Sequence, residues 1–457
     1  MTLTSINPTT GKIIAKFDEW NTETINKQLA TSIGAFDCWK KTEYQERKTL
    51  LKNTALLLHS SKASYAKLMS TEMGKPIQQA EAEVDKCAWV CNFYAENGQD
   101  FLKSQVVGTD TEKSYVQFNP LGIILGIMPW NYPFWQVFRW AAPSLMAGNV
   151  AVLKHSSNVP QCASVIEDIF RESGLPNDVF KNIPISSQRI AELIQDERIA
   201  AISLTGSSAA GSSTARLAGS CIKKTVLELG GSDPFIVFND ANIDNASTVA
   251  VQARMMNTGQ SCIAAKRFIV LKEVFDEFAE QLTKKIENLT VGNPLDPTTD
   301  IGPLARLDMV EQLEKQVRTS VEKGAAILTG GKRPGNTTGF FYLPTVLSNV
   351  KKGMSVYDEE TFGPVAALIK VKDEKEALQV ANDTCYGLGA SIWTDDTKKA
   401  EQWSKHLQAG NVFINEMVKS DPRLPFGGIK QSGYGRELSQ YGIKEFVNIQ
   451  TVYIKEP

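Results

Sequence analysis

The chain has 457 residues, and its 49 Lys and Arg side chains nearly balance its 51 Asp and Glu side chains. The net charge of −2 gives no basis for binding nucleic acid, because such a partner requires a basic face that neutralises phosphates. Hydrophobic residues make up 42% of the chain and charged residues 22%, which is ordinary globular usage and allows a large core. Seven cysteines are too few, and odd in number, for a secreted disulfide framework, so we expect reduced thiols.

Neither the N-terminus nor the most apolar stretch predicts export or membrane insertion. Residues 1–8 lack the charged and apolar regions of a signal peptide. The apolar stretch 121–135 is interrupted by Pro129 and Pro133, and it is shorter than the ~20 residues that a membrane-spanning helix needs. We therefore expect a cytoplasmic protein without a membrane partner.

Helices and strands alternate along most of the chain. Apolar spacings of three and four residues predict helices over 22–36, over 50–69 and from Pro76 onward. An alternating pattern over 114–118 predicts an exposed strand. Short apolar runs then predict buried strands at 122–127, 150–153, 200–204, 234–238, 268–271, 365–371 and 388–393. Helices are expected at 273–289 and 308–322. The alternation predicts two α/β units with parallel sheets.

Three segments carry residues suited to covalent chemistry. Cys262 ends the small-residue segment 257–262, where a ligand could reach its thiol, although most cysteines are inert buried residues. Glu228 interrupts an apolar run before a Gly-Gly turn, which fits either a structural partner or a raised pKa. Asn131 lies in a proline-stiffened turn, where it is either an oxyanion donor or an ordinary turn residue.

A glycine-containing loop over 206–211 follows a predicted strand and opens a helix, which is a suitable position for a phosphate. Its spacing matches neither the dinucleotide-binding fingerprint nor the P-loop, so alone it is weak evidence. The three histidines, His59, His155 and His406, show no metal-ligand spacing, and no metal site is predicted.

Taken together, these segments resemble the NAD(P)-dependent aldehyde dehydrogenases over nearly the whole chain, and the substrate residues resemble the succinic semialdehyde branch. The matching segments, in chain order, are 129–131, 153–154, 205–207, 227–231, 259–262, 359–364 and 425–433. The resemblance implies an α/β fold of the aldehyde dehydrogenase type, with two doubly wound α/β domains and a small β-extension for oligomerisation. It implies a cofactor-binding domain of residues 1–98 and 121–230, a catalytic domain of 231–442, and an extension of 99–120 and 443–457.

The resemblance also assigns the catalytic roles. Cys262 attacks the aldehyde as a thiolate, and the Asn131 side chain stabilises the oxyanion. Hydride passes to the cofactor, and Glu228 is the general base for water that hydrolyses the thioester. The partner is a small aldehyde, and the protein is expected to be a homodimer or homotetramer.

The cofactor implied is NADP, with NAD as the second possibility. Because NAD-preferring members often have Glu where this chain has Ser157, the sequence lacks a carboxylate that would repel a 2′-phosphate. The implied cofactor-binding residues are Trp130, Asn131, Lys154, His155, Ser156, Ser157, Gly206, Ser207, Leu229, Glu360 and Phe362.

Two residues suggest the substrate by the same resemblance. Arg139 and Ser420 match positions that bind the distal carboxylate of succinic semialdehyde, whereas Met256 stands where that branch often has a second Arg. Oxidation of succinic semialdehyde to succinate is therefore the leading prediction. The alternatives are a broad-specificity aldehyde dehydrogenase and, from a different class, a non-catalytic structural or binding protein on the same fold.

Overall fold

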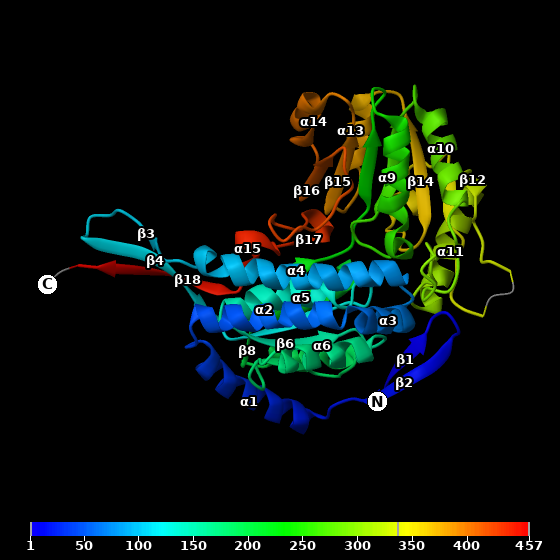
Figure 1. Ribbon diagram of the computed structural model, residues 1–457. Helices are drawn as coiled ribbons and strands as arrows, with labels where there is room; N and C mark the ends of the chain where they lie inside the picture. Colours follow the sequence, from blue (N-terminus) through cyan, green and yellow to red (C-terminus); the bar gives the residue numbers. More distant parts are fainter. Residues whose placement is uncertain (1, 336–337, 456–457) are drawn as a thin grey trace.

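The computed structural model describes residues 2–335 and 338–455, which form two lobes and a projecting arm (Figure 1). Residues 1, 336, 337, 456 and 457 fall within the predicted domain ranges but lie outside this description. None of the helices within the described ranges is long and apolar enough to cross a membrane.

The lower lobe in Figure 1 contains the sheet that we call the first sheet. Its strands are parallel, except that β17 pairs antiparallel with β9. In spatial order they are β17 (Gly433–Tyr434), β9 (Lys224–Glu228), β8 (Ile199–Thr205), β5 (Ile123–Met128), β6 (Val150–His155) and β7 (Phe180–Asn182). The helices of this lobe are α1 (Thr22–Trp39), α2 (Tyr44–Ser60), α3 (Lys62–Met73), α4 (Ile77–Phe101), α5 (Trp135–Met146), α6 (Pro160–Glu172), α7 (Ile190–Gln195), α8 (Ser208–Ser220) and α15 (Ser439–Lys444).

The upper lobe contains the second sheet, which is parallel except for the β12–β13 pair. Its strands in order are β12 (Ala326–Thr329), β13 (Thr345–Ser348), β14 (Val365–Val371), β11 (Ala265–Leu271), β10 (Asp233–Val237), β15 (Gly389–Trp393) and β16 (Asn411–Ile414). Its helices are α9 (Ile243–Met255), α10 (Phe275–Glu287), α11 (Leu307–Glu322), α12 (Ser355–Asp358), α13 (Glu374–Asn382) and α14 (Thr397–Ser404). The central strands of both sheets, β5, β6 and β8 in the first and β10, β11, β14 and β15 in the second, are largely buried apolar runs, as parallel sheets covered on two faces require.

Two smaller sheets complete the fold. The arm consists of β18 (Val447–Ile454), β4 (Lys113–Pro120) and β3 (Gln105–Val106), and β18 runs outward along it (Figure 1). A hairpin of β1 (Thr2–Asn7) and β2 (Lys12–Asp18), which the sequence analysis did not include, lies at the start of the chain. The fold class expected from the sequence is confirmed: two parallel α/β units with a β-extension.

The structure differs from the sequence expectations at two places. The helix expected over 50–69 is two helices, because the backbone at Ser61 leaves the helical conformation between α2 and α3. Residues 433–444, expected in the catalytic domain, instead join the first lobe: β17 pairs with β9, and α15 packs against α4. Gly433 permits this pairing, since a Cβ there would lie 2.0 Å from the carbonyl oxygen of Leu227.

Candidate active site

The residues expected to carry chemistry meet at the carboxyl edge of the first sheet, where it faces the second lobe. Asn131 follows β5, Gly206 follows β8, and Glu228 ends β9. The neighbours of β5 are β8 on one side and β6 on the other, so the strand order reverses direction there. Open parallel sheets bind ligands at such a point.

The loop of the candidate nucleophile Cys262, residues 256–264, connects α9 to β11, and we call it the nucleophile loop. Asn257, Thr258 and Gly259 have φ values of 55°, 56° and 73°, which is the left-handed region. A side chain at Gly259 would lie 2.3 Å from the carbonyl oxygen of Gly363, so only glycine fits. Non-glycine residues held in this region cost about 1–3 kcal/mol each and persist only where the surroundings fix them.

The buried guanidinium of Arg254 is one group that fixes this loop. It donates to the carbonyl oxygens of Gly259 at 2.9 Å, Ala265 at 3.1 Å and Thr361 at 3.2 Å, and it also bonds that of Gly363. Burial lowers the Arg254 pKa to about 9. Arg254 therefore ties the loop to the segment that begins with Glu360.

Lys266 holds the other end of the nucleophile loop. Its Nζ donates to the carbonyl oxygens of Ser261 at 3.0 Å, Cys262 at 2.8 Å and Ala264 at 3.1 Å. Sequence reasoning missed both Arg254 and Lys266. The signal available for Lys266 was a cation inside the apolar strand pattern directly after the candidate nucleophile.

Cys262 lies where two cavities meet, because its half-buried side chain lines both of them. One, the cleft, has a volume of about 620 Å³, and the other, the inner cavity, has about 300 Å³. Burial raises the pKa of the Cys262 thiol to about 12; the charges of Arg139 and Lys266 act to lower it, whereas Glu228 raises it. These two cations favour the thiolate that a nucleophile needs.

Asn131 is buried beside the nucleophile loop, and its amide is oriented by two contacts. Its Oδ1 accepts from Gln136 Nε2 at 3.2 Å, and its Nδ2 donates to the carbonyl oxygen of Gln260 at 3.0 Å. The Asn131 carbonyl oxygen in turn accepts from Asn257 Nδ2 at 2.7 Å. An amide nitrogen carries two protons, so one N–H of Asn131 remains for a ligand in the cleft that both Asn131 and Cys262 line.

Glu228 is buried at the end of β9 with an exposed fraction of 1%. Burial, opposed by the charge of Arg139 and aided by that of Glu437, raises the pKa of Glu228 to about 8. A side chain at Gly427 would lie 2.8 Å from Glu228 Oε1, so this glycine leaves space for the carboxylate. A carboxylate with a pKa near neutral pH is suited to general-base work.

Arg139 lies in the wall of the inner cavity, on α5, but its charge is already partnered. It forms a buried ion pair with Glu437 and donates to Thr205 Oγ1 at 3.3 Å. Its guanidinium carbon lies 5.0 Å from the centre of the Phe426 ring. The structure thus places Arg139 in the wall of the inner cavity, with its charge shared with Glu437.

The cleft collects most of the residues expected to bind a cofactor. A side chain at Gly230 would lie 2.5 Å from Glu360 Oε2, so glycine keeps the cleft open there. Ser207 caps α8 by accepting from the Ala210 N–H at 3.3 Å, and the turn of Gly206 and Ser207 borders the cleft. The expected residues that line the cleft are Trp130, Asn131, Ser156, Gly206, Ser207, Leu229, Glu360 and Phe362.

Three expected cofactor residues are not part of the cleft wall. Both ring nitrogens of His155 are engaged, Nε2 with the carbonyl oxygen of Pro133 at 2.9 Å and Nδ1 with the Ser156 N–H at 2.8 Å. Burial lowers the pKa of His155 to about 4 and that of Lys154 to about 8. Ser157 is half-buried beyond Ser156, which does line the cleft.

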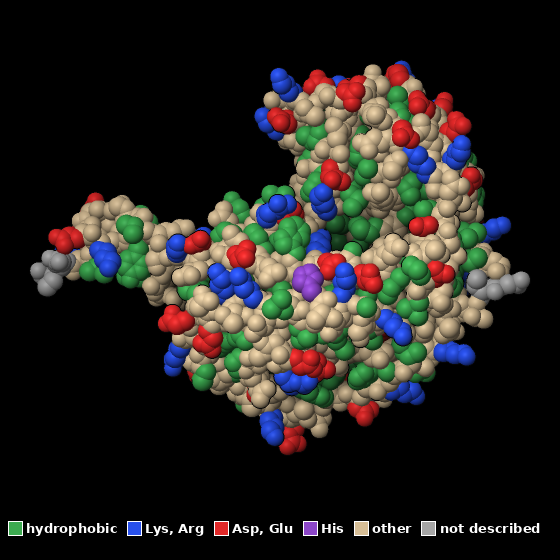
Figure 2. Space-filling model, in the orientation of Figure 1, with side chains coloured by type: hydrophobic (Ala, Val, Ile, Leu, Met, Phe, Trp, Pro, Cys, Tyr) green, Lys and Arg blue, Asp and Glu red, His purple; other side chains and the backbone are tan. Residues whose placement is uncertain are grey.

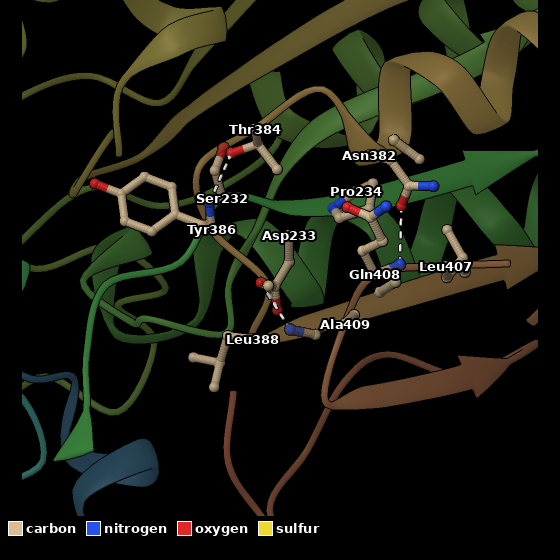
Figure 3. Close-up of a pocket in the computed structure, with 14 residues that line it drawn as sticks. Ser232, Asp233, Pro234, Asn382, Thr384, Tyr386, Leu388, Leu407, Gln408 and Ala409 are labelled. Carbon is tan, nitrogen blue, oxygen red and sulfur yellow. Dashed lines mark hydrogen bonds between the residues drawn. The ribbon is translucent and has the colours of Figure 1, made fainter. Parts of the chain in front are cut away.

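A further hollow, drawn in Figure 3, lies beside Asp233 in the second lobe. The Gly389 N–H donates to Asp233 Oδ1 at 3.0 Å, and the Gln408 N–H donates to Asn382 Oδ1 at 2.8 Å. Burial raises the pKa of Asp233 to about 6. With a volume of about 10 Å³, this hollow has room for about one water molecule and not for a substrate or cofactor.

Known proteins are similar to this chain over nearly its whole length. The model of the aldehyde dehydrogenase family matches residues 1–452. The "Probable succinate-semialdehyde dehydrogenase (NADP⁺)" of Synechocystis is 49% identical, covering 99% of this chain and 100% of the relative. The succinate-semialdehyde dehydrogenase (NADP⁺) of Mycobacterium leprae is 44% identical with the same coverage.

A solved structure matches closely as well. The crystal structure of succinic semialdehyde dehydrogenase from Streptococcus pyogenes in complex with NADP⁺ superposes with a TM-score of 0.97 and 37% identity, covering 99% of this chain and 100% of that one. The chain belongs to the aldehyde dehydrogenase family. The family resemblance inferred from its motifs is therefore confirmed.

Proposed function

We propose that the protein oxidises succinic semialdehyde to succinate through a thioester on Cys262, with NADP⁺ as the preferred hydride acceptor. The observation that carries the proposal is the position of Cys262 between two cavities of different character. The cleft has dinucleotide-scale volume, and the inner cavity has cationic side chains in its wall. The names of the relatives above support the same substrate and cofactor.

Covalent capture of the aldehyde is the first step. The Cys262 thiolate adds to the carbonyl carbon, a C–S bond forms, and the carbonyl electrons move to oxygen. The free N–H of Asn131 donates to this oxyanion, and the cations Arg139 and Lys266 favour the thiolate that starts the step.

The cleft fits a nicotinamide dinucleotide by volume and by the turn that precedes α8, where helix amides favour phosphate. Trp130 and Phe362, with ring centres 5.8 Å apart, would border the nicotinamide, and Gly206 and Ser207 would hold the pyrophosphate. When bound, the dinucleotide supplies a hydride acceptor, so that the hemithioacetal carbon becomes a thioester. Glu360 lines the same cleft and would hold the nicotinamide ribose.

Glu228 then acts on the thioester. As a carboxylate it takes a proton from water, the water oxygen bonds to the acyl carbon, and the C–S bond breaks to return the Cys262 thiolate and release the acid. The pKa of about 8 means that the basic form increases as the pH rises toward and through that value. This residue favours hydrolysis over transfer of the acyl group to another acceptor.

Preference for NADP⁺ rests on Ser157. The residue places a neutral hydroxyl after β6, at a position where a carboxylate would repel a 2′-phosphate and bind ribose hydroxyls instead. Lys154, on β6, is a nearby cation whose pKa is lowered to about 8 by burial. NAD⁺ is expected to be the poorer cofactor.

The substrate class is tested with two aldehydes of equal length. Succinic semialdehyde has a distal carboxylate and butyraldehyde has none, so cations in the inner cavity should favour the former. We expect kcat/KM with NADP⁺ to be about tenfold or more higher for succinic semialdehyde, since a hydrogen bond to a charged group contributes roughly 1.5–3 kcal/mol. Equal values for the two aldehydes would leave only a general aldehyde dehydrogenase.

We further infer a cytoplasmic homo-oligomer that assembles through the arm. The arm extends away from both lobes (Figure 1), and it exposes apolar side chains, including Val106 with an exposed fraction of 86% and Ile449 with 61%. Exposed strand edges of this kind favour pairing with another chain. Sedimentation analysis of the full chain and of a Val106→Asp, Ile449→Asp double variant should give an oligomer and a smaller species; identical sizes would contradict the role of the arm.

A further inference from the structure

The inner cavity contains a cation that the proposed mechanism does not use. Lys86 projects into it from α4, and its Nζ donates to Ser420 Oγ at 2.8 Å and lies 4.4 Å from the centre of the Trp135 ring. In the described part of the chain Lys86 forms no ion pair. An ammonium group has three N–H donors, so two remain after the bond to Ser420.

The other charged groups around the inner cavity already have partners. Glu83 accepts from the N–H groups of Phe134 and Trp135, each at 2.9 Å, and pairs with the buried Lys75. Lys419 pairs with Glu416 at 2.8 Å. Because the charges of Glu83, Lys75 and Lys419 are already paired, none of these groups attracts an anion strongly.

Arg139 is another cation in the wall of the inner cavity, but it is already paired with Glu437. Its buried ion pair with Glu437 neutralises much of its charge toward a ligand. It is also the strongest of the charges that lower the pKa values of Cys262 and Glu228. If Arg139 left Glu437 to bind a substrate, it would leave a buried carboxylate unpaired, which is costly.

Resting on the function proposed above, we propose that Lys86 is the principal binding residue for the distal carboxylate of the substrate, with Ser420 as a second donor. The Lys86 Nζ directs its two free N–H groups to the carboxylate, and the Ser420 hydroxyl, which accepts from Lys86, donates its own proton. Arg139 then acts mainly on Cys262 and Glu228. One cation therefore selects the substrate, and another adjusts the reactivity of the catalytic groups.

The electrostatics of Lys86 give a pH signature. Burial, together with the charge of Arg139 on α5, lowers the pKa of Lys86 to about 8. Glu83 and Cys87 on the same helix and Asp421 in the segment after β16 act in the opposite direction. Below pH 8 the free enzyme carries a charged Lys86, and above pH 8 this charge is lost, so the preference for a carboxylate substrate should decline there.

The test uses the ratio of kcat/KM for succinic semialdehyde to that for butyraldehyde, because effects on Cys262 and Glu228 largely cancel in it. Lys86→Met should lower this ratio about tenfold to one-hundredfold, mainly by raising KM for succinic semialdehyde. Lys86→Arg should keep most of the ratio and keep it above pH 8, since guanidinium remains charged. Lys419→Met, a matched lysine bordering the same cavity, should change the ratio by less than about twofold.

The outcomes separate the two proposals. A wild-type ratio well above one that Lys86→Met leaves unchanged would overturn the role of Lys86 and keep the substrate assignment. A wild-type ratio near one would overturn the substrate assignment itself. If Lys86→Met fails to fold, the pH profiles of wild type and Lys86→Arg decide: a wild-type ratio that is flat through pH 8 would contradict the inference.

Discussion

The cleft and the inner cavity meet at Cys262, but the chain builds them in different ways. The cleft is formed largely by turns at strand ends, where backbone groups and glycines such as Gly206 and Gly230 set its shape. The inner cavity is walled by side chains of α4, α5, the nucleophile loop and the segment after β16, and its character depends on a few charges. Figure 2 shows a hollow between the lobes bordered by charges of both signs. Changes in the cleft should therefore affect cofactor choice, and changes in the inner cavity should affect substrate choice.

The largest effect should come from the thiol that both cavities share. Cys262→Ala should reduce dehydrogenase activity to background with every aldehyde and both cofactors, because the covalent step requires the thiolate. Cys38→Ala removes an exposed thiol on α1 and serves as the control, with activity close to wild type. Steady-state rates of both variants measure this, and substantial turnover by Cys262→Ala would contradict the mechanism.

Glu228→Gln should slow thioester hydrolysis by about 10²–10⁴-fold, since it removes the general base. The wild-type kcat should rise with pH through about 8, as the Glu228 carboxylate forms, and the variant should lose this dependence. Rapid-mixing measurements should show a burst of reduced cofactor followed by a slow phase. A variant with the wild-type pH profile would assign the base to another group.

Asn131→Ala should lower kcat by about 10²–10³-fold, because it removes an oxyanion donor that lines the cleft together with Cys262. Its effect should be similar for succinic semialdehyde and butyraldehyde, which distinguishes it from changes to Lys86. Steady-state kinetics with both aldehydes measure this. An effect confined to one of them would instead indicate a role in substrate selection.

Ser157→Glu should have a smaller effect, confined to the cofactor. The new carboxylate should lower kcat/KM for NADP⁺ about tenfold or more by repelling the 2′-phosphate, and it should improve use of NAD⁺. Ser157→Ala is the matched control and should keep the wild-type preference. A wild-type enzyme that strongly prefers NAD⁺ would show that this position does not govern the choice.

The difference between the cavities also explains what the sequence could predict. Cys262, Glu228 and the cleft residues fall in short contiguous motifs, because turns at strand ends are local in sequence. Lys86 and Ser420 are 334 residues apart and meet only when α4 packs beside the segment after β16. Their pairing has no local signal.

The same argument applies to the supports of the site. Sequence resemblance identified Arg139 but not Glu437, whose ion pair forms only when the chain after β17 returns to the first lobe. Arg254 lies on an ordinary helical pattern, and its bonds to the nucleophile loop depend on tertiary packing. Parallel strands were predictable since their apolar runs are local, whereas the β1–β2 hairpin has weak patterning.

The central claim is that Cys262 captures an aldehyde acid from the inner cavity and that the bound hemithioacetal loses its hydride toward the cleft. Mass spectrometry of the trapped thioester tests this claim most directly. Glu228→Gln incubated with succinic semialdehyde and NADP⁺ should gain the mass of one succinyl group, and peptide mapping should locate it on Cys262. Omitting NADP⁺ should prevent the gain. An adduct on another cysteine, or no adduct while reduced cofactor forms, would contradict the account.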